Sequence, residues 1–279
     1  MQNDYFIKNI YSKFLDISGE DSSEFLQGLI TNDINKCKDG KPIYACLLTP
    51  QGKFSSDFFI IKYLNHYIIE IHEKYFDSFY SKLKIYKLRS KVEFKENTDL
   101  LSLIIFSKHN PLFGKNTIFF DDPRNNNLGV KAYIDKKSND LKLITKLKEY
   151  EFDIYKQILM KNLVPNSTTD LIENKSLLLE NNFQNINAID WNKGCYIGQE
   201  ITARMKYRSL LKKQIYALEL LSGNISPGDD IIQKEINIGS VISKTGQYVL
   251  CMLKINLIEN KSFNNEQIKT NSNALLKFL

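Results

Sequence analysis

The chain has 279 residues, of which 43% are hydrophobic and 12% aromatic, which is enough apolar material for two or three packed units. No run approaches the roughly 18 consecutive apolar residues of a membrane helix, and the first residues lack the basic and apolar regions of a secretion signal. We therefore expect a folded cytoplasmic protein without membrane contact. The net charge is +6, but lysines are spread along the whole chain, a distribution typical of solvated faces that gives no direct evidence for nucleic-acid binding.

The four cysteines stand at positions 37, 46, 195 and 251. They form no C-x-x-C pair and have no companion histidines at metal-ligand spacing, which argues against a self-contained zinc or iron–sulfur site. We predict no resident metal. Any contact with a metal cluster would require ligands from a partner.

Helices and antiparallel strands alternate through the first hundred residues. Apolar side chains recur at spacings of three and four, and so predict helices over 22–30 and 74–86. Turn residues and β-rich runs predict strands at 43–48, 54–63, 67–71, 91–94 and 101–106. The regular βαβ spacing of a parallel sheet is missing, and this favours an α+β fold over a doubly wound one.

The stretch 107–145 is polar and is interrupted by Pro111, Gly114, Pro123 and Gly129, which predicts an insertion or sub-domain crossing with strands of its own. A helix over 150–162 should end before Pro165, because the residue preceding a proline avoids helical geometry. Beyond residue 208, strands are expected at 214–221, 239–243 and 248–253, with turns at 226–229 and 246. Short strands with regular turns suggest a small barrel.

Cys195 is the residue for which the sequence most strongly predicts chemistry. It lies between Gly194 and Gly198, two residues after Lys193, and a helix is expected to follow. A lone cysteine is usually a small buried hydrophobe, but glycines permit close backbone approach and a nearby ammonium or helix N-terminus favours the thiolate. We expect Cys195 to ionise more readily than an ordinary thiol, which the pH profile of its alkylation would test.

Three segments resemble a known family. Residues Lys193, Gly194, Cys195, Tyr196, Gly198, Gln199 and Glu200 reproduce the K-G-C-Y-x-G-Q-E signature of the YgfZ-type folate-binding, tRNA-modifying proteins, which are relatives of the glycine-cleavage aminomethyltransferase (GcvT, or T-protein). The stretches 25–34 and 48–53 resemble the F-L-Q-G-x-L-T-N-D-V and L-T-P-Q-G-[KR] segments of that family. The resemblance runs from about Gly19 to Arg208, with no usable signature over 93–153. Gln157 and Asn162 stand where the family usually has arginine and glycine.

The resemblance implies a GcvT/YgfZ-like α+β fold: two α+β domains and a C-terminal small β-barrel around a central opening. Residues 1–208 would form the folate-binding region, as two interleaved subdomains of which the second covers roughly 95–165. Residues 209–279 would form the barrel.

The resemblance also implies roles for individual residues, each with a structural alternative. Cys195 would face the opening as a redox thiol or a transient iron–sulfur ligand, and tetrahydrofolate would be a bound ligand. Lys193, Arg204 and Arg208 would pair with the folate carboxylates, or be ordinary solvated cations. Tyr196 and Trp191 would stack on the ligand, although a single tryptophan is often a core anchor. The remaining candidates for the folate site are Gly194, Gln199, Glu200, Asn32 and Asp33. Glu200 equally suits the first turn of a helix. Asn32 and Asp33 equally suit a local cap of the backbone.

The leading functional interpretation is a folate-binding accessory factor for iron–sulfur cluster assembly or repair, supporting iron–sulfur enzymes that include those modifying tRNA. Its partners would be folate and iron–sulfur proteins or cluster carriers, with an indirect effect on tRNA. The alternative is a tetrahydrofolate-dependent aminomethyl or methyl transferase using Asp57, which stands where aminomethyltransferases have an acidic pair. A third possibility, direct tRNA binding, would be strongly salt-sensitive.

Overall fold

The computed structural model describes residues 4–107, 114, 117–144, 146–258 and 268–279. Pro111, one of the predicted breaks, lies outside the described residues. Within the described ranges, no helix combines the length and the apolar character needed to cross a membrane.

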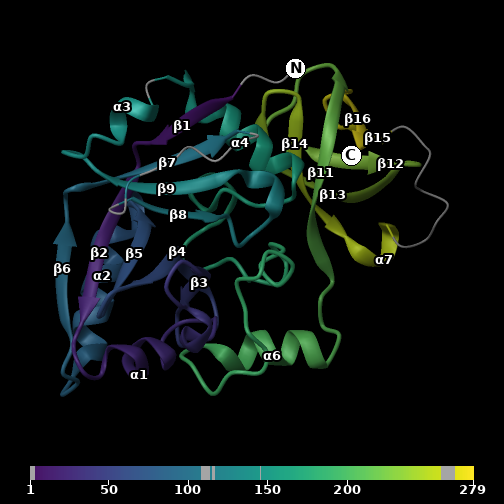
Figure 1. Cartoon of the computed structure of the whole chain (residues 1–279). Coiled ribbons are helices and arrows are strands. Elements are labelled where there is room, and N and C mark those ends of the chain that lie inside the picture. Colours follow the sequence, from purple (N-terminus) through teal and green to yellow (C-terminus); the bar gives the residue numbers. More distant parts are fainter. Residues whose placement is uncertain (1–3, 108–113, 115–116, 145, 259–267) are drawn as a thin grey trace.

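The first of two five-stranded sheets is antiparallel. Its order is β3-β4-β5-β2-β6, with bounds β2 (Ser12–Ser18), β3 (Ile43–Leu48), β4 (Phe54–Tyr63), β5 (His66–His72) and β6 (Glu93–Asn97). Helix α2 (Glu73–Lys87) contacts β2, β4 and β5 and covers one face of this sheet (Figure 1). Helix α1 (Ser22–Gln27) and the 3-10 turn η1 (Ile34–Lys36) connect β2 to β3. The strands predicted over 43–48 and 54–63 and the α2 helix are confirmed.

The second sheet has the order β10-β1-β7-β9-β8. Its strands are β1 (Tyr5–Asn9), β7 (Leu100–Phe106), β8 (Ile118–Asp121), β9 (Val130–Asp135) and β10 (Lys148–Tyr150), and η2 (Asn126–Leu128) precedes β9. The N-terminal strand β1 pairs antiparallel with β7 and parallel with β10. Strand β1, which was not predicted from the sequence, belongs to this sheet, and the chain returns to the sheet only after β6.

Alternation along the strands gives the second sheet two buried faces. Phe6 and Ala132 pack with Ile144 of helix α3 (Leu141–Ile144) on one face. Ile7 and Tyr133 point the other way, into the large core that the second sheet shares with the first. Opposite faces follow from the two-residue period of a strand, so the two sheets enclose one common core.

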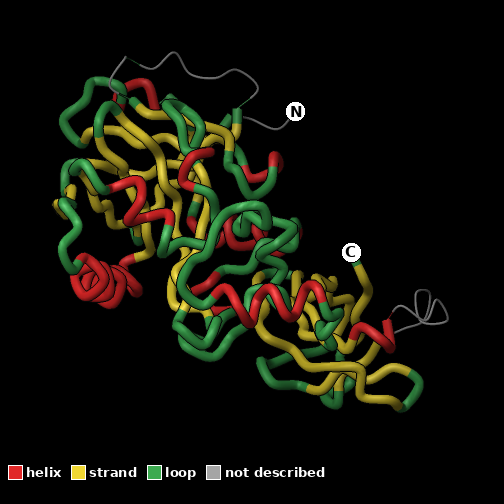
Figure 2. The backbone as a smooth tube through the Cα atoms, turned by 90° about the horizontal axis from the view of Figure 1, so that it is seen from below, coloured by secondary structure: helices red, strands yellow, loops and turns green. Residues whose placement is uncertain are grey.

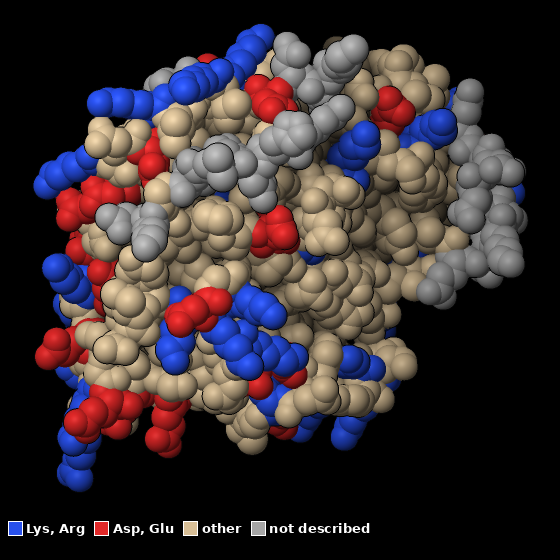
Figure 3. Space-filling model, viewed as in Figure 1, with Lys and Arg blue, Asp and Glu red and all other residues tan. Residues whose placement is uncertain are grey.

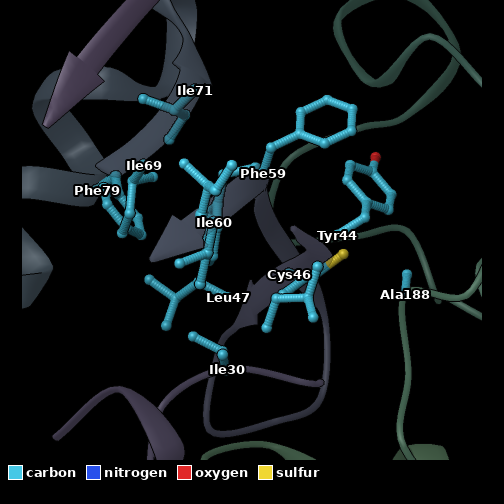
Figure 4. Close-up of a cluster of buried hydrophobic side chains, with 14 of the residues drawn as sticks. Ile30, Tyr44, Cys46, Leu47, Phe59, Ile60, Ile69, Ile71, Phe79 and Ala188 are labelled. Atoms are coloured by element: carbon cyan, nitrogen blue, oxygen red, sulfur yellow. The ribbon is translucent and has the colours of Figure 1, made fainter. Parts of the chain in front are cut away.

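One side of β3 faces a long irregular segment that runs from helix α5 (Ser167–Asp170) to helix α6 (Gln199–Tyr207). Figure 4 shows Tyr44 and Cys46 on the side of β3 toward Ala188, with Ile69 and Phe79 on the opposite side. The Thr31 hydroxyl donates to the Ala188 carbonyl at 2.6 Å and accepts from the Cys46 amide at 2.9 Å. This segment is therefore attached to the first sheet by buried hydrogen bonds.

The C-terminal region forms a closed barrel, as expected. Its order is β11-β14-β13-β12-β15-β16, with bounds β11 (Lys213–Ser222), β12 (Asp230–Gln233), β13 (Ile236–Thr245), β14 (Tyr248–Lys254), β15 (Ile268–Thr270) and β16 (Leu275–Phe278), and a short helix α7 (Ile255–Ile258) after β14. Figure 2 shows this barrel as a body set apart from the two sheets, with the C-terminus on it. The mixed α+β architecture with a C-terminal barrel is confirmed.

Helix α4 (Phe152–Lys161) joins the barrel to the sheets, since it contacts β1 as well as β13 and β14. Met160 packs with Ile215 and Leu250 of the barrel. Gln157 approaches the Gly246 turn so closely that a Cβ there would lie 2.7 Å from its Oε1 atom. Gln157, which stands where the resembled family usually has arginine, thus lies at the contact between α4 and the barrel.

Candidate functional site

A cavity lies where the first sheet, the second sheet and α4 meet. Its volume is about 80 Å³, and it is partly open to solvent. Polar side chains from all three elements line it, together with aromatic ones: Asn9, Ser12, Tyr44, Asp57, Phe58, Phe59, Glu70, His72, Arg124, Lys131, Phe152 and Tyr155. Of the residues that the sequence analysis assigned to the site, Asp57 alone lines this cavity.

Asp57 lies on β4, and its carboxylate has one partnered and one free oxygen. The Tyr44 hydroxyl donates to Oδ2 at 2.5 Å, while Oδ1 is buried without a hydrogen-bond partner in the described structure. Burial and the neighbouring Asp57 carboxylate hold the pKa of Tyr44 well above its usual value, so this hydroxyl stays a donor. Asp57 Oδ1 is therefore an acceptor ready for a ligand donor.

Glu70 and Lys131 form a buried ion pair across the two sheets, with Nζ 2.8 Å from Oε2. The Tyr133 and Ser12 hydroxyls also donate to this carboxylate, at 2.8 and 2.5 Å. Burial alone would raise the pKa of Glu70, but the ammonium and the hydrogen bonds outweigh it and lower that pKa. The pair places two fixed opposite charges in the cavity wall.

A second buried ion pair lies beside the first. Arg124 donates to Asp122 through Nε at 3.0 Å and Nη2 at 2.7 Å, and to the Tyr155 hydroxyl at 2.8 Å. The guanidinium lies over the rings of Tyr44 and Phe59, with its central carbon 5.2 and 4.7 Å from their centroids. Burial opposes its charge, but Asp122 and Tyr155 keep the pKa of Arg124 well above its usual value. Arg124 is a permanent cation held by the wall.

The free groups of the cavity favour a ligand that donates hydrogen bonds. Asn9 Oδ1, like Asp57 Oδ1, is buried and has no partner in the described structure, whereas the cations of the wall are already paired. Unsatisfied buried acceptors are unfavourable unless a ligand or water completes them. With aromatic walls nearby, the cavity suits a flat ring that carries N–H and amino groups.

Cys195 is exposed, whereas Cys37, Cys46 and Cys251 are buried. Burial raises the pKa of Cys37 to about 12 and those of Cys46 and Cys251 above the ordinary thiol value. Cys195 does not line the cavity described above. The expectation that it faces a central opening stays a prediction; its side chain is exposed.

Lys193, which the sequence predicts as a folate contact, lies inside the protein. Its side chain is buried, and Nζ donates to the carbonyls of Gln27, Ile30 and Asn32 at 2.7, 2.6 and 3.0 Å. An ammonium has three donors, so none is left for a folate carboxylate. Burial lowers the pKa of Lys193 to about 8. This geometry gives the predicted folate contact of Lys193 no support, because the side chain points into the protein.

The two aromatic candidates also lie outside the cavity. Tyr196 is buried with the Lys193 ammonium 4.9 Å from its ring centroid, so its face is covered. Trp191 packs on the large core, with Lys206 Nζ 3.8 Å from the centroid of its ring and Tyr207 edge-on at 6.2 Å. Trp191 fits the core-anchor alternative, and Tyr196 is likewise part of the large core.

Asn32 and Asp33 are local connectors. Asn32 Nδ2 donates to the carbonyls of Tyr44 and Asn187 at 2.9 and 2.8 Å. Asp33 caps η1 by accepting from the amide of Asn35 at 3.0 Å. Neither lines the cavity, so the capping alternative holds for Asp33 and a linking role for Asn32.

The remaining candidates lie around α6, outside the cavity. Gln199 is the first residue of α6, Glu200 pairs with Arg204 one turn along, and Arg208 is the exposed C-cap. Both arginines are exposed, and a surface ion pair of this kind contributes little to stability. Gly194 is exposed, and a Cβ there would meet no atom within 4 Å.

Gly198 has a structural reason to be glycine. Its φ is +80°, and a Cβ would lie 2.4 Å from the Thr49 carbonyl oxygen. We expect Gly198→Ala to lower the free energy of unfolding by about 2–5 kcal/mol through strain and overpacking, and Gly194→Ala to leave it within about 0.5 kcal/mol. Thermal unfolding of the two variants checks this; equal melting temperatures would contradict the close contact.

Among the described residues, no group of three or more His, Cys, Asp or Glu side chains is arranged to hold a metal ion. Most residues of the cavity, among them Glu70, Arg124 and Lys131, were not predicted from the sequence. Glu70 and Lys131 each interrupt an apolar strand sequence, a signal that could have flagged them as a buried pair. Arg124 comes from the stretch that carried no recognisable signature.

Comparison with known proteins identifies the fold and its relatives. A family model described as the GCVT N-terminal domain matches residues 11–105. Aminomethyltransferase T of the glycine cleavage system from Bartonella henselae superposes with a TM-score of 0.77 over 98% of this chain and 84% of that one, at 11% identity. That similarity establishes the shared fold.

The sequence relatives carry two kinds of name. A mitochondrial "Iron-sulfur cluster assembly factor IBA57 homolog" of Neurospora crassa is 29% identical over 230 residues, covering 73% of this chain and 51% of that protein. The "tRNA-modifying protein YgfZ" of Aliivibrio fischeri is 25% identical over 229 residues, covering 78% and 72%. The chain thus spans about half the length of the IBA57 homologue. The chain therefore carries a match to the GCVT N-terminal domain over residues 11–105, and it is similar in sequence to proteins named IBA57 and YgfZ.

Proposed function

We propose that this chain is a folate-binding accessory factor for iron–sulfur cluster assembly or repair, in which Cys195 is the working thiol. The carrying observation is that Cys195, within the family signature, is exposed while the other three cysteines are buried. The names of the relatives favour this role over catalysis.

The cluster would be cargo, bound jointly with a partner. Iron–sulfur clusters commonly require four thiolate ligands, and this chain offers one exposed thiol. The partner, an iron–sulfur protein or a cluster carrier, would supply the remaining ligands. A thiol on the outside of the molecule suits such a shared site better than one inside a cavity would.

Tetrahydrofolate is proposed for the cavity, and the residues there fit it. Its reduced pterin ring carries N–H and amino donors, which Asp57 Oδ1 and Asn9 Oδ1 are placed to accept. The ring would pack against the aromatic wall. Asp57, rather than the residues around Cys195, would then determine folate affinity.

Asp57→Asn tests the folate assignment. We expect it to weaken tetrahydrofolate binding about 10–100-fold, because a charge-assisted hydrogen bond contributes about 1.5–3 kcal/mol. Isothermal titration calorimetry measures the change. Asp33→Asn is the control, since Asp33 lies outside the cavity and its substitution should leave the Kd within about twofold. Equal affinity for wild type and Asp57→Asn would remove the cavity as the folate site.

A transferase remains the second candidate because Asp57 presents a free carboxylate oxygen within an aminomethyltransferase-like fold. In that case Asp57 would act as acid or base on the substrate amine. The transferase hypothesis requires Asp57→Ala to abolish activity and Cys195→Ala to be tolerated. The accessory-factor proposal requires Cys195.

The effect on tRNA is proposed to be indirect, through iron–sulfur enzymes that modify it. Lys and Arg are interspersed with Asp and Glu on the face seen in Figure 3, and a mixed surface of this kind gives weak support to phosphate-backbone binding. A cytoplasmic location stays a prediction; the IBA57 homologue is named mitochondrial.

A further inference from the structure

The Lys193 ammonium is enclosed by three carbonyls of one short segment. Gln27 is the last residue of α1, and Ile30 and Asn32 follow in the loop to η1. Carbonyls at a helix C-terminus lack intrahelical partners and carry partial negative charge, so they attract a cation. The three distances, 2.6–3.0 Å, use all the donors of one ammonium.

Backbone hydrogen bonds join the same two segments on either side of this contact. The Asp190 amide donates to the Thr31 carbonyl at 3.0 Å, and the Ile197 amide donates to the Gly28 carbonyl at 3.1 Å. The segment 190–197 therefore runs alongside residues 28–31, with Lys193 as the side-chain contact between the two backbone contacts.

Cys195 lies between two buried anchors in this segment. Lys193 and Tyr196 are 8% and 7% exposed, whereas Gly194 and Cys195 are exposed. A Cβ added at Gly194 would meet no atom of the described residues within 4 Å, so this position faces open space. The outward turn that carries the thiol thus depends on the anchors at its two ends.

We propose that Lys193 is a positioning residue that fixes the Cys195 turn on the 27–32 segment, so that the thiol is presented outward in one place. This deepens the proposed function and rests on it, because Lys193 acts through Cys195. Lys193 touches neither folate nor cluster in this account. Asn32 extends the support inward, since its carbonyl accepts from Lys193 and its Nδ2 donates to the Tyr44 carbonyl beside the cavity.

The test is a nitroxide spin label on Cys195, read by electron paramagnetic resonance in the full chain. The three other cysteines are buried, so the label attaches to Cys195. We expect Lys193→Met to give a more mobile label. In cells lacking the family protein, we expect the unlabelled variant to support iron–sulfur enzymes about 10–100-fold less well than the wild-type chain does. Its tetrahydrofolate affinity should stay within about twofold. Lys277→Met, which removes an exposed ammonium on barrel strand β16, is the matched control and should change neither readout.

A chemical rescue separates positioning from general damage. In Lys193→Ala, n-propylammonium can occupy the space of the missing side chain and should restore the ordered spectrum, whereas 1-propanol should not. If Lys193→Met folds poorly, this rescue decides the question instead. An unchanged spectrum in Lys193→Met, or rescue by both additives alike, overturns the proposal. Full activity of Cys195→Ala would instead overturn the proposed function, and the label would still report on positioning.

Discussion

Cys195→Ala is expected to reduce the chain's support of iron–sulfur enzymes at least about 10-fold, to the level of cells lacking the family protein. Because the side chain is exposed, its removal should change the free energy of unfolding by less than about 0.5 kcal/mol. The loss would therefore be one of chemistry rather than of folding. The activity of a radical-type tRNA methylthiolase in complemented cells is a suitable measurement.

Two matched variants make this result specific. Asn192→Ala changes an exposed residue of the same loop and should retain full activity. Cys195→Ser keeps the size but supplies a hard oxygen in place of a soft thiolate, and should fail like alanine. Wild-type activity in Cys195→Ala would contradict the account and leave the Asp57 transferase as the better candidate.

Lys131→Met is expected to lower the free energy of unfolding by about 3–5 kcal/mol, because it leaves the Glu70 carboxylate charged and unpaired in the interior. Both side chains of the pair are only 2–3% exposed. The double variant Glu70→Gln with Lys131→Met should recover most of this loss, since it removes both charges. Denaturant unfolding of the wild type, the two single variants and the double variant measures the coupling.

The same pair predicts a pH dependence. The pKa of Glu70 is lowered in the folded chain from the ordinary value of 4.5, so the folded state favours the carboxylate. Its contribution is present above pH 4.5 and decreases as the pH falls through the lowered folded pKa. As the pH drops below 4.5, the free energy of unfolding of Glu70→Gln should therefore fall less than that of the wild type. Additive effects in the double variant, or identical acid profiles, would show that the pair is not coupled.

Local patterns predicted the regular elements well. The hairpin of β3 and β4 follows from the Pro50–Gly52 turn between two apolar runs, and α2 follows from Phe76, Phe79 and Leu83 at helical spacing. The barrel likewise follows from short strands separated by turn residues. Each of these elements depends on residues close together in sequence, which a periodic pattern records directly.

The second sheet was harder to predict, because its pairing joins distant parts of the chain. Strand β1 is five residues long, and it lies between β7 and β10, more than ninety positions away. A short strand has no periodicity of its own beyond two alternations. Its place is determined by long-range backbone pairing and by the common core, neither of which a local pattern contains.

The site shows the same limit in its side chains. Lys193 is adjacent in sequence to the Cys195 turn, but its long side chain reaches inward to the Gln27, Ile30 and Asn32 carbonyls. The cavity, by contrast, brings together Asp57 and Lys131 from strands of different sheets. Motif spacing pointed to a thiol that is exposed in the structure, but among the predicted ligand residues only Asp57 lines the cavity.

The central claim is that the ligand cavity and the working thiol are separate places on this fold. Alkylation of native protein by iodoacetamide, followed by mass spectrometry with and without saturating tetrahydrofolate, tests it directly. We predict that Cys195 is modified while Cys37, Cys46 and Cys251 are spared, and that folate changes the Cys195 rate by less than about twofold, because burial controls thiol access and Cys195 lies outside the cavity. Strong protection of Cys195 by tetrahydrofolate, or an unreactive Cys195, would contradict the account.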